Sequence, residues 1–237
     1  MKSDTSQKSN SITKNFFEKK AWQQNLFVCG IDEVGRGCLA GPVVVGAVIL
    51  PINTTYHLLK DSKVLTEEER EKAFDWIVRN CTWATGHVSA QVVDSVNIYQ
   101  ATLLAMKKAF LSLFSQLPFP QEKLAYTLID AMPLKLEKPI VPTTLEFCHF
   151  NYGEKFSTSI AAASIVAKVT RDHLLEKYAT LLPGFELEKH KGYATKAHIE
   201  KLSFHGASAI HRKTFITNFA HNKKQEDITQ KTLFDLL

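Results

Sequence analysis

Carboxylates close two apolar stretches of this sequence. Asp32 and Glu33 follow the apolar run 27–31 and precede glycines, while Asp130 ends the run 126–129. Acidic side chains are rarely buried without partners, so acids at such places need a cation or hydrogen-bond donors. Carboxylate oxygens are hard ligands that suit Mg²⁺ or Mn²⁺. The pattern therefore predicts a divalent-metal site, and the alternative is that each acid caps a turn independently.

Two strands must bring these acids together. If the strands that end at Asp32 and Asp130 are parallel neighbours, both acids lie at the carboxyl ends of the sheet, where such sheets place their sites. Asp32 and Glu33 point to opposite faces of a regular strand. They serve one site only if the strand frays or turns there, which Gly35 and Gly37 permit.

The pattern of the whole chain predicts an α/β domain with a mixed sheet covered by helices. Thr66 starts a helix, because it forms a capping box with Glu69 ahead of apolar residues at helical spacing. We expect strands near 27–32, 43–50, 82–89, 126–131 and 145–150, and further helices near 95–115, 159–178, 195–204 and 211.

Other familiar motifs are misleading or missing. The pattern Gly35-x-Gly37-x-x-Ala40 satisfies a dinucleotide-binding fingerprint, but Pro42 and the β-branched run after it predict a strand where that fingerprint needs a helix. The sequence has neither the phosphate-binding loop of nucleotide hydrolases nor the nucleophile elbow of serine hydrolases. Its four cysteines lack the paired spacing of zinc sites, so we expect the reduced thiols of a cytoplasmic protein.

The composition is that of a globular chain with a basic segment. Of its 237 residues 45% are hydrophobic, no apolar run is long enough to span a bilayer, and no signal peptide is visible. The formal net charge is +5, but residues 189–224, with eight Lys or Arg against one Glu, carry +7. This segment indicates a polyanionic partner such as nucleic acid, or equally a solvated basic helix face. Acids that hold metal ions can activate water against a phosphodiester, whereas they would weaken a pure binder, so an enzyme is the better interpretation.

At these residues the chain resembles the ribonuclease HII family. The resemblance runs from about Phe27 to Phe215 and rests on motifs in the family's order and spacing: 32–37 (DEVGRG), 61–63 (DSK), 128–130 (LID), 162–172 (AASIVAKVTRD) and 190–193 (HKGY). It implies an RNase H-like fold, with a central mixed sheet, flanking helices and a helical C-terminal extension. Residues 1–20 are polar and unpatterned, so we expect a flexible N-terminal arm there, followed by a catalytic domain over 21–182 and an extension over 183–237 that contributes to substrate binding.

The resemblance implies a metal-dependent endoribonuclease that acts on RNA·DNA hybrids and on ribonucleotides embedded in duplex DNA. Cleavage would fall on the 5′ side of the ribonucleotide and leave 3′-OH and 5′-phosphate ends, as ribonucleotide excision in DNA repair requires. Of two Mg²⁺ or Mn²⁺ ions, one would help to generate the attacking water and the other would stabilise the leaving 3′-oxygen. We expect a cytoplasmic monomer without membrane contact. The alternative is a non-catalytic nucleic-acid binding protein with a degenerate acid site.

The family's functional residues carry over position by position. Asp32, Glu33 and Asp130 match its metal-binding acids, which are also the expected catalytic residues. The fourth acid is usually Asp after Gly, but Glu154 stands here with one more methylene, and we expect it to substitute functionally. The expected substrate contacts are a loop that senses the ribose 2′-OH, a phosphate contact and a tyrosine against the sugar at the RNA–DNA junction: Gly35, Arg36, Gly37, Lys63 and Tyr193.

One acid in the matching motifs has a simpler explanation. Asp172 lies four residues after Lys168 on the expected helix, so we expect the two to form an ion pair on the helix surface rather than to act in catalysis.

Overall fold

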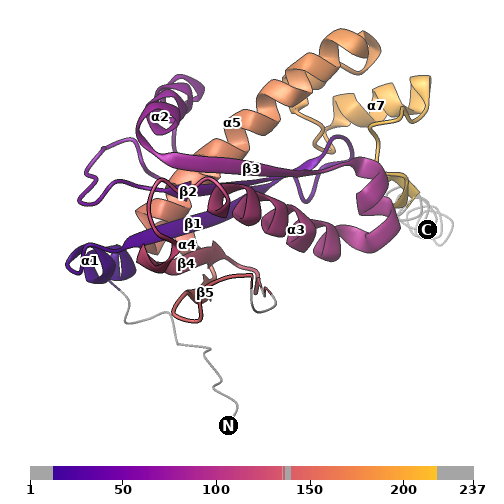
Figure 1. The fold of residues 1–237 in the computed structure, drawn as a ribbon. Coiled ribbons are helices and arrows are strands. Elements are labelled where there is room, and N and C mark those ends of the chain that lie inside the picture. Colours follow the sequence, from indigo (N-terminus) through magenta and orange to yellow (C-terminus); the bar gives the residue numbers. More distant parts are fainter. Residues whose placement is uncertain (1–12, 135, 137–139, 218–237) are drawn as a thin grey trace, which may run out of the picture.

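Five strands form one mixed sheet at the centre of the protein. The computed structural model describes residues 13–134, 136 and 140–217 (Figure 1). The strands lie in the order β3-β2-β1-β4-β5. Their bounds are β1 Phe27–Val34, β2 Val43–Ile49, β3 Thr82–Val88, β4 Leu124–Asp130 and β5 Glu146–Phe150. Each agrees closely with a strand expected from the sequence.

β1 joins an antiparallel half of the sheet to a parallel half. It pairs antiparallel with β2, where Asp32 lies opposite Gly46, and parallel with β4, where Ile31 lies opposite Ile129. β2 continues antiparallel to β3, and β4 continues parallel to β5. The carboxyl ends of β1 and β4 therefore meet at the same edge of the sheet, which is the condition under which Asp32 and Asp130 were expected to share a site.

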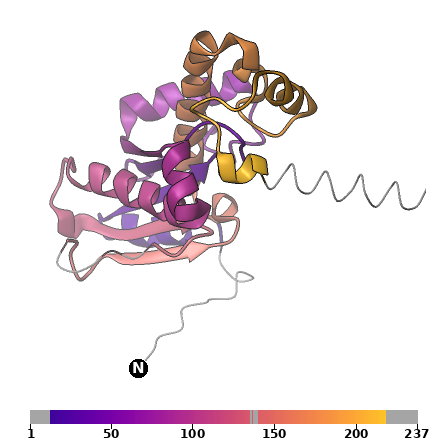
Figure 2. The same ribbon diagram turned by 90° about the vertical axis from the view of Figure 1, so that its right-hand side faces the viewer.

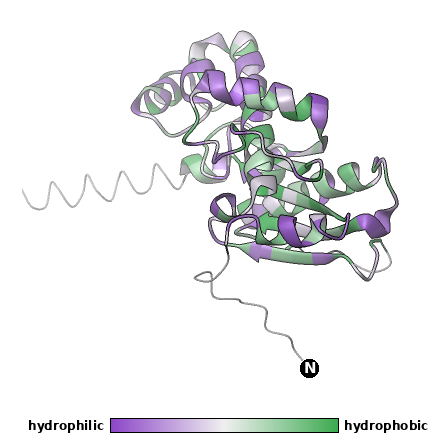
Figure 3. Cartoon of the chain, turned by 90° about the vertical axis from the view of Figure 1, so that its left-hand side faces the viewer, coloured by the Kyte–Doolittle hydropathy of each residue, from purple (hydrophilic) through white to green (hydrophobic). Residues whose placement is uncertain are grey.

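Helices cover both faces of the sheet (Figure 2). α3, Ala90–Phe114, packs on one face, and α5, Thr158–Leu181, packs on the other beside α2, Glu67–Asn80. Close approach of α5 depends on Gly46 in β2, because a Cβ atom there would lie 2.3 Å from the carbonyl oxygen of Ala163. Hydrophobic residues line the strands and the inner helix faces, while hydrophilic ones lie outward (Figure 3).

The starts of α2 and α3 are set by local capping. Thr66 Oγ1 accepts from the backbone N–H of Glu69 at 3.2 Å, and the Glu69 carboxylate accepts from the N–H of Thr66 at 2.8 Å, so the predicted capping box is confirmed. α3 begins at Ala90, earlier than expected, because the Ser89 side chain caps it. The helical pattern from about residue 95 missed this first turn, since Asn97, with a φ of 67°, interrupts the helix.

The flexible arm expected over residues 1–20 is wrong at its C-terminal end. Residues 1–12 lie outside the described part of the chain, but Phe16–Trp22 form helix α1. Glu18 is fully buried there, and Asn15 Oδ1 accepts a backbone N–H from the first turn of α5 at 2.9 Å. Polar side chains of this segment cap α5 and thereby anchor α1. The polar composition of the segment therefore gave no sign of a docked helix.

Short helices follow α5 in the C-terminal part, as expected. The remaining elements are η2 Gln121–Lys123, α4 Gly153–Phe156, η3 Pro183–Phe185, α6 Leu187–His190 and α7 Lys196–His205, and a last helical turn begins at 213. α7 lies beyond the sheet beside the outer end of α5 (Figure 1). No helix within the described ranges is long and apolar enough to cross a membrane.

Candidate active site

Asp32 and Asp130 stand at the shared edge of β1 and β4. Burial raises the pKa of Asp32 well above its ordinary value, and the negative charges of Glu33 and Asp130 add to the rise. Burial also raises the pKa of Asp130, against the hydrogen bond that its Oδ1 accepts from Gly153 N at 2.8 Å. The charge of Asp130 acts on Asp32, so the two acids belong to one electrostatic site.

The backbone of β1 stays regular past Glu33, but Glu33 still belongs to the acid site, because its charge raises the pKa of Asp32 and the charge of Asp130 raises its own pKa. β1 stays paired with β2 through Val34, and the turn follows at Gly35, whose φ is +89°. Regular alternation therefore directs Glu33 and Asp32 to opposite faces. Arg36 Nη1 donates to Glu33 Oε1 at 3.1 Å, and this contact opposes the rise in the Glu33 pKa that burial causes.

Glu154 reaches the site from the single turn of α4. Its side chain is buried, and burial raises the pKa of its carboxyl, with a further rise from the charges of Asp130 and Asp61. The preceding residue, Gly153, donates its N–H to Asp130, so the loop that carries Glu154 is tied to the end of β4. The structure thus brings the fourth predicted acid beside Asp130 in spite of its extra methylene.

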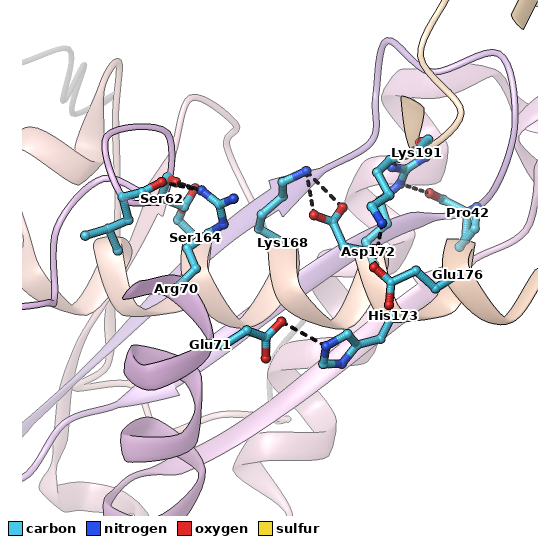
Figure 4. Close-up of polar contacts among 12 residues, drawn as sticks. Pro42, Ser62, Arg70, Glu71, Ser164, Lys168, Asp172, His173, Glu176 and Lys191 are labelled. Carbon is cyan, nitrogen blue, oxygen red and sulfur yellow. Dashed lines mark hydrogen bonds and ion pairs between the residues drawn. The ribbon is translucent and has the colours of Figure 1, made fainter. Parts of the chain in front are cut away.

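Asp61 is a site residue that the sequence reasoning missed. Its negative charge raises the pKa values of both Asp130 and Glu154, while the positive charge of Lys63 lowers them. Ser62 between them fixes this loop, because its Oγ lies 2.6 Å from Ser164 Oγ in α5 (Figure 4). The motif Asp61-Ser62-Lys63 was the available signal, but only its lysine was assigned a role. Lys63 is exposed.

The glycine loop and Tyr193 form a second part of the site. After Gly35 the chain exposes Gly37, where a Cβ atom would meet nothing within 4 Å. The segment just after this loop is joined to the Tyr193 segment, because Leu39 N donates to Gly192 O at 2.9 Å. Tyr193 is 41% exposed, and the guanidinium of Arg171 lies 5.9 Å from the centroid of its ring.

The four acids fit divalent cations by their chemistry, although they do not surround one. Burial raises the pKa of each, so each carboxylate gains from a positive charge. Glu33 Oε2 and Glu154 Oε2 are buried and have no hydrogen-bond partner among the described residues. Within those same residues, no three Asp, Glu, His or Cys side chains stand close enough together to hold an ion. Mg²⁺ usually takes one or two carboxylates, which these acids can supply in pairs, and completes its shell with water or phosphate oxygens.

A family comparison decides what chemistry this acid site serves. The family model described as ribonuclease HII matches residues 29–218, which include every predicted site residue. This chain belongs to the ribonuclease HII family. The ribonuclease HII of Caldanaerobacter subterraneus subsp. tengcongensis is 42% identical to it over 208 residues, covering 85% of this chain and 79% of the relative. Membership of a family of endoribonucleases favours the enzyme interpretation over the non-catalytic binding protein.

Solved structures confirm the RNase H-like fold of this ribonuclease HII. The crystal structure of the ribonuclease H2 from Pyrococcus horikoshii OT3 matches with a TM-score of 0.63 and 23% identity, covering 80% of this chain and 93% of that one. The structure of Bst-RNase HIII in complex with Mn²⁺ matches with a TM-score of 0.60 and 18% identity, covering 78% and 73%. At such identities the likeness establishes the fold alone.

In this ribonuclease HII the basic segment 189–224 is not a row of free cations. Lys191 donates to Glu176 of α5 (Figure 4), Lys189 pairs with a glutamate at 3.0 Å, and Arg212 is fully buried. The acids that pair with these lysines lie outside the segment in sequence, so the local count of +7 overstated its free charge. The last residues of the segment, from 218 onward, lie outside the described part of the chain.

The remaining charged pairs along α5 are structural. Lys168 Nζ lies 2.8 Å from the Asp172 carboxylate, so the predicted ion pair is confirmed (Figure 4). His173 Nε2 contacts Glu71 of α2 at 2.9 Å. All four cysteines are free, as expected.

Proposed function

We propose that this ribonuclease HII cuts the phosphodiester on the 5′ side of ribonucleotides embedded in duplex DNA, and cuts RNA in RNA·DNA hybrids. The products would carry 3′-OH and 5′-phosphate ends. The observation that carries the proposal is the set of carboxylates at the carboxyl ends of the parallel strands β1 and β4, followed by a glycine loop in which Gly37 is exposed. Acids for metal ions and a backbone loop for the sugar are what hydrolysis at a ribose requires.

We assign the metal-binding and catalytic roles to Asp32, Glu33, Asp130 and Glu154. Mg²⁺ or Mn²⁺ bound there would supply positive charge that activates water and stabilises the leaving 3′-oxygen. The positions of the carboxylates would determine where the metal ions bind. Asp32 and Asp130 are central because both face the α5 side of the sheet at its edge. Glu33 Oε2 and Glu154 Oε2, which no described residue contacts by a hydrogen bond, would complete the set.

Recognition of the substrate is assigned to the other part of the site. Gly35, Arg36 and Gly37 would contact the ribose 2′-OH, the group that distinguishes RNA from DNA. Tyr193 would pack its ring against the adjoining sugar. Lys63 would contact a phosphate near the acids, and such contacts make binding weaken steeply with salt.

A nicking assay tests the proposal. A DNA duplex with one ribonucleotide is incubated with the protein and Mg²⁺ or Mn²⁺, and the products are resolved on a denaturing gel beside an all-DNA duplex. One nick on the 5′ side of the ribonucleotide, and none in the control, is the expected result. Binding without a nick under either metal would instead support the non-catalytic binding protein.

The assembly and location stay predictions. We expect a monomer that acts in the cytoplasm without membrane contact, and the free thiols are compatible with a reducing compartment. Sedimentation of the purified protein would test the monomer, since a dimer would have twice the mass of 26.7 kDa.

A further inference from the structure

Two arginines are buried beneath the glycine loop without any carboxylate partner. Arg171 and Arg212 are both 0% exposed. Neither takes part in an ion pair among the described residues. A buried charge without a counter-ion is costly unless other groups satisfy it. Here backbone carbonyl oxygens accept hydrogen bonds from both arginines. The residues that supply these carbonyls show which segments each arginine holds in place.

Arg212 binds the carbonyls of the glycine loop itself. Its Nη2 donates to Gly35 O at 2.7 Å, and its Nη1 donates to Arg36 O at 2.8 Å. Nε and Nη2 also donate to Gly41 O at 3.3 and 3.0 Å, beyond the loop. One rigid guanidinium therefore fixes the two peptide groups on either side of Arg36.

These contacts determine where the loop's N–H groups point. In a planar trans peptide the C=O and N–H bonds are antiparallel. Because Gly35 O and Arg36 O face the buried guanidinium, the N–H groups of Arg36 and Gly37 face away from it. Gly37 is exposed, and neither N–H has a partner among the described residues. Two adjacent donors are thus directed outward beside the acid site.

Arg212 is itself held from the opposite side. The carboxylate of Asp94 in α3 accepts from Lys213 N at 2.8 Å and from Thr214 N at 3.0 Å. The backbone of Arg212 is tied as well, since its N–H donates to Leu39 O at 2.8 Å. The arginine cannot follow the loop outward without breaking these bonds.

We propose that Arg212 is a positioning residue for ribose recognition. By holding the carbonyls of Gly35 and Arg36 inward, it presents the N–H groups of Arg36 and Gly37 to the 2′-oxygen of the ribonucleotide. This inference rests on the proposed function, because it assumes that the loop meets the 2′-OH. It adds a residue from the distant C-terminal part, which the sequence reasoning counted only as one charge of the basic segment 189–224.

A binding ratio isolates this role. Full-length protein carrying Asp130→Asn, so that it binds without cutting, is titrated in Mg²⁺ with two fluorescent duplexes that differ by a single 2′-OH. The ratio of the two Kd values measures recognition of the ribose alone. In the Arg212→Lys variant we expect this ratio to fall about tenfold, the effect of about one neutral hydrogen bond, because Lys cannot hold both carbonyls.

Arg171→Lys is the matched control. Arg171 is equally buried, but it donates to Ala40 O, Pro42 O and Lys191 O and has no hydrogen bond to the carbonyls that face Arg212 in the loop. Arg171 also packs against Gly35 and over the Tyr193 ring. Its replacement leaves the two loop carbonyls bound to Arg212, so it should alter both affinities alike and keep the ratio. An unchanged ratio in Arg212→Lys, or an equal fall in both variants, would overturn the proposal.

Two further measurements keep the test decisive. If Arg212→Lys does not fold, Asp94→Asn can replace it, because it weakens the hydrogen bonds to the backbone next to Arg212. A ratio of Kd values that stays at the parent value in Asp94→Asn would also refute the positioning role of Arg212. A parent protein that neither nicks the ribonucleotide duplex nor distinguishes it from DNA would instead refute the proposed function. The two failures are therefore separate observations.

Discussion

The acid site and the pair Arg171 and Arg212 are both buried clusters whose members carry charges of one sign. They differ in how fully their polar atoms are hydrogen-bonded within the chain. Every guanidinium nitrogen of Arg171 and Arg212 donates to a carbonyl oxygen within the chain. Among the acids, Glu33 and Glu154 each keep one buried oxygen that has no hydrogen-bond partner in the described part of the chain. The chain therefore satisfies its buried cations internally and leaves its buried anions for a ligand.

The pKa values show the same contrast. Burial lowers the pKa of Arg212 to about 10, which still leaves it charged at neutral pH. Burial raises the pKa values of the four acids, so their charged forms are destabilised until a cation arrives. Replacing a member of each group should therefore change stability in opposite directions.

The largest expected effect is that of Asp130→Asn. Cleavage should fall by at least ~100-fold, because one of the central acids is lost. Stability in the absence of metal should rise by roughly 0.5–2 kcal/mol, since a destabilised charge is removed. Nicking assays and urea denaturation in EDTA measure the two effects. A less stable variant would show that Asp130 is tied into the fold more strongly than repelled by its neighbours.

Arg212→Met should have the opposite effect on stability. It leaves Gly35 O, Arg36 O and Gly41 O buried without a donor, and we expect a loss of about 3 kcal/mol. Urea denaturation, with Arg36→Met on the loop surface as the control, measures it. A loss below about 1 kcal/mol would mean that water replaces the guanidinium.

A third buried polar group, the pair His198 and His211, is neutral and should respond to pH. Their Nε2 atoms lie 3.0 Å apart, and His198 Nδ1 donates to Tyr193 O at 2.8 Å, so the shared proton belongs to His211. Burial lowers the pKa of His211 to about 4. An unfolded His binds a proton near pH 6.5. The stability that neutral His211 contributes is thus present above pH 6.5 and lost as pH falls toward 4.

Thermal melting tests this pH dependence. Between pH 7 and pH 4.5 the Tm advantage of the wild type over His211→Gln should shrink by about 5 °C. His57→Gln, at an exposed position, is the control and should keep a constant difference from the wild type. A constant difference for His211→Gln as well would mean that the pair is not held neutral.

The smallest effect concerns Glu154. Glu154→Asp should cleave at nearly the wild-type rate, because the turn of α4 can place either carboxylate beside Asp130. Glu154→Gln should be about tenfold slower, since it keeps the shape and loses the charge. Initial nicking rates in Mn²⁺ compare the three proteins. Equal rates would remove Glu154 from the set of metal ligands.

Local signals predicted the strands and the meeting of Asp32 with Asp130. Strand ends, glycine turns and the capping box at Thr66 are determined by residues close together in the chain. They can therefore be recognised from a single sequence. The RNase H-like fold came from the matching motifs. Local signals could not decide whether the strand turns at Glu33, because pairing with β2, a long-range effect, keeps the strand regular past it.

The arginines could not be recognised in the same way. Arg212 becomes buried only when carbonyls from residues 35, 36 and 41 surround it, and no local pattern announces that arrangement. A basic residue in a basic segment was therefore counted only as one of its charges. Asp61 escaped for a related reason, because its effect on Asp130 arises only when its loop folds against the sheet.

Helix α1 also has a consequence for the order of events during synthesis. Asn15 and Glu18 leave the ribosome early, but the N–H groups of Thr158 and Ser159 that they cap emerge only after most of the chain has been made. α1 therefore cannot dock on the first turn of α5 until all strands of the sheet have been translated. The turn that carries Glu154 directly precedes those N–H groups in the chain. The nascent enzyme should therefore position its fourth acid and the groups that bind α1 in the same step.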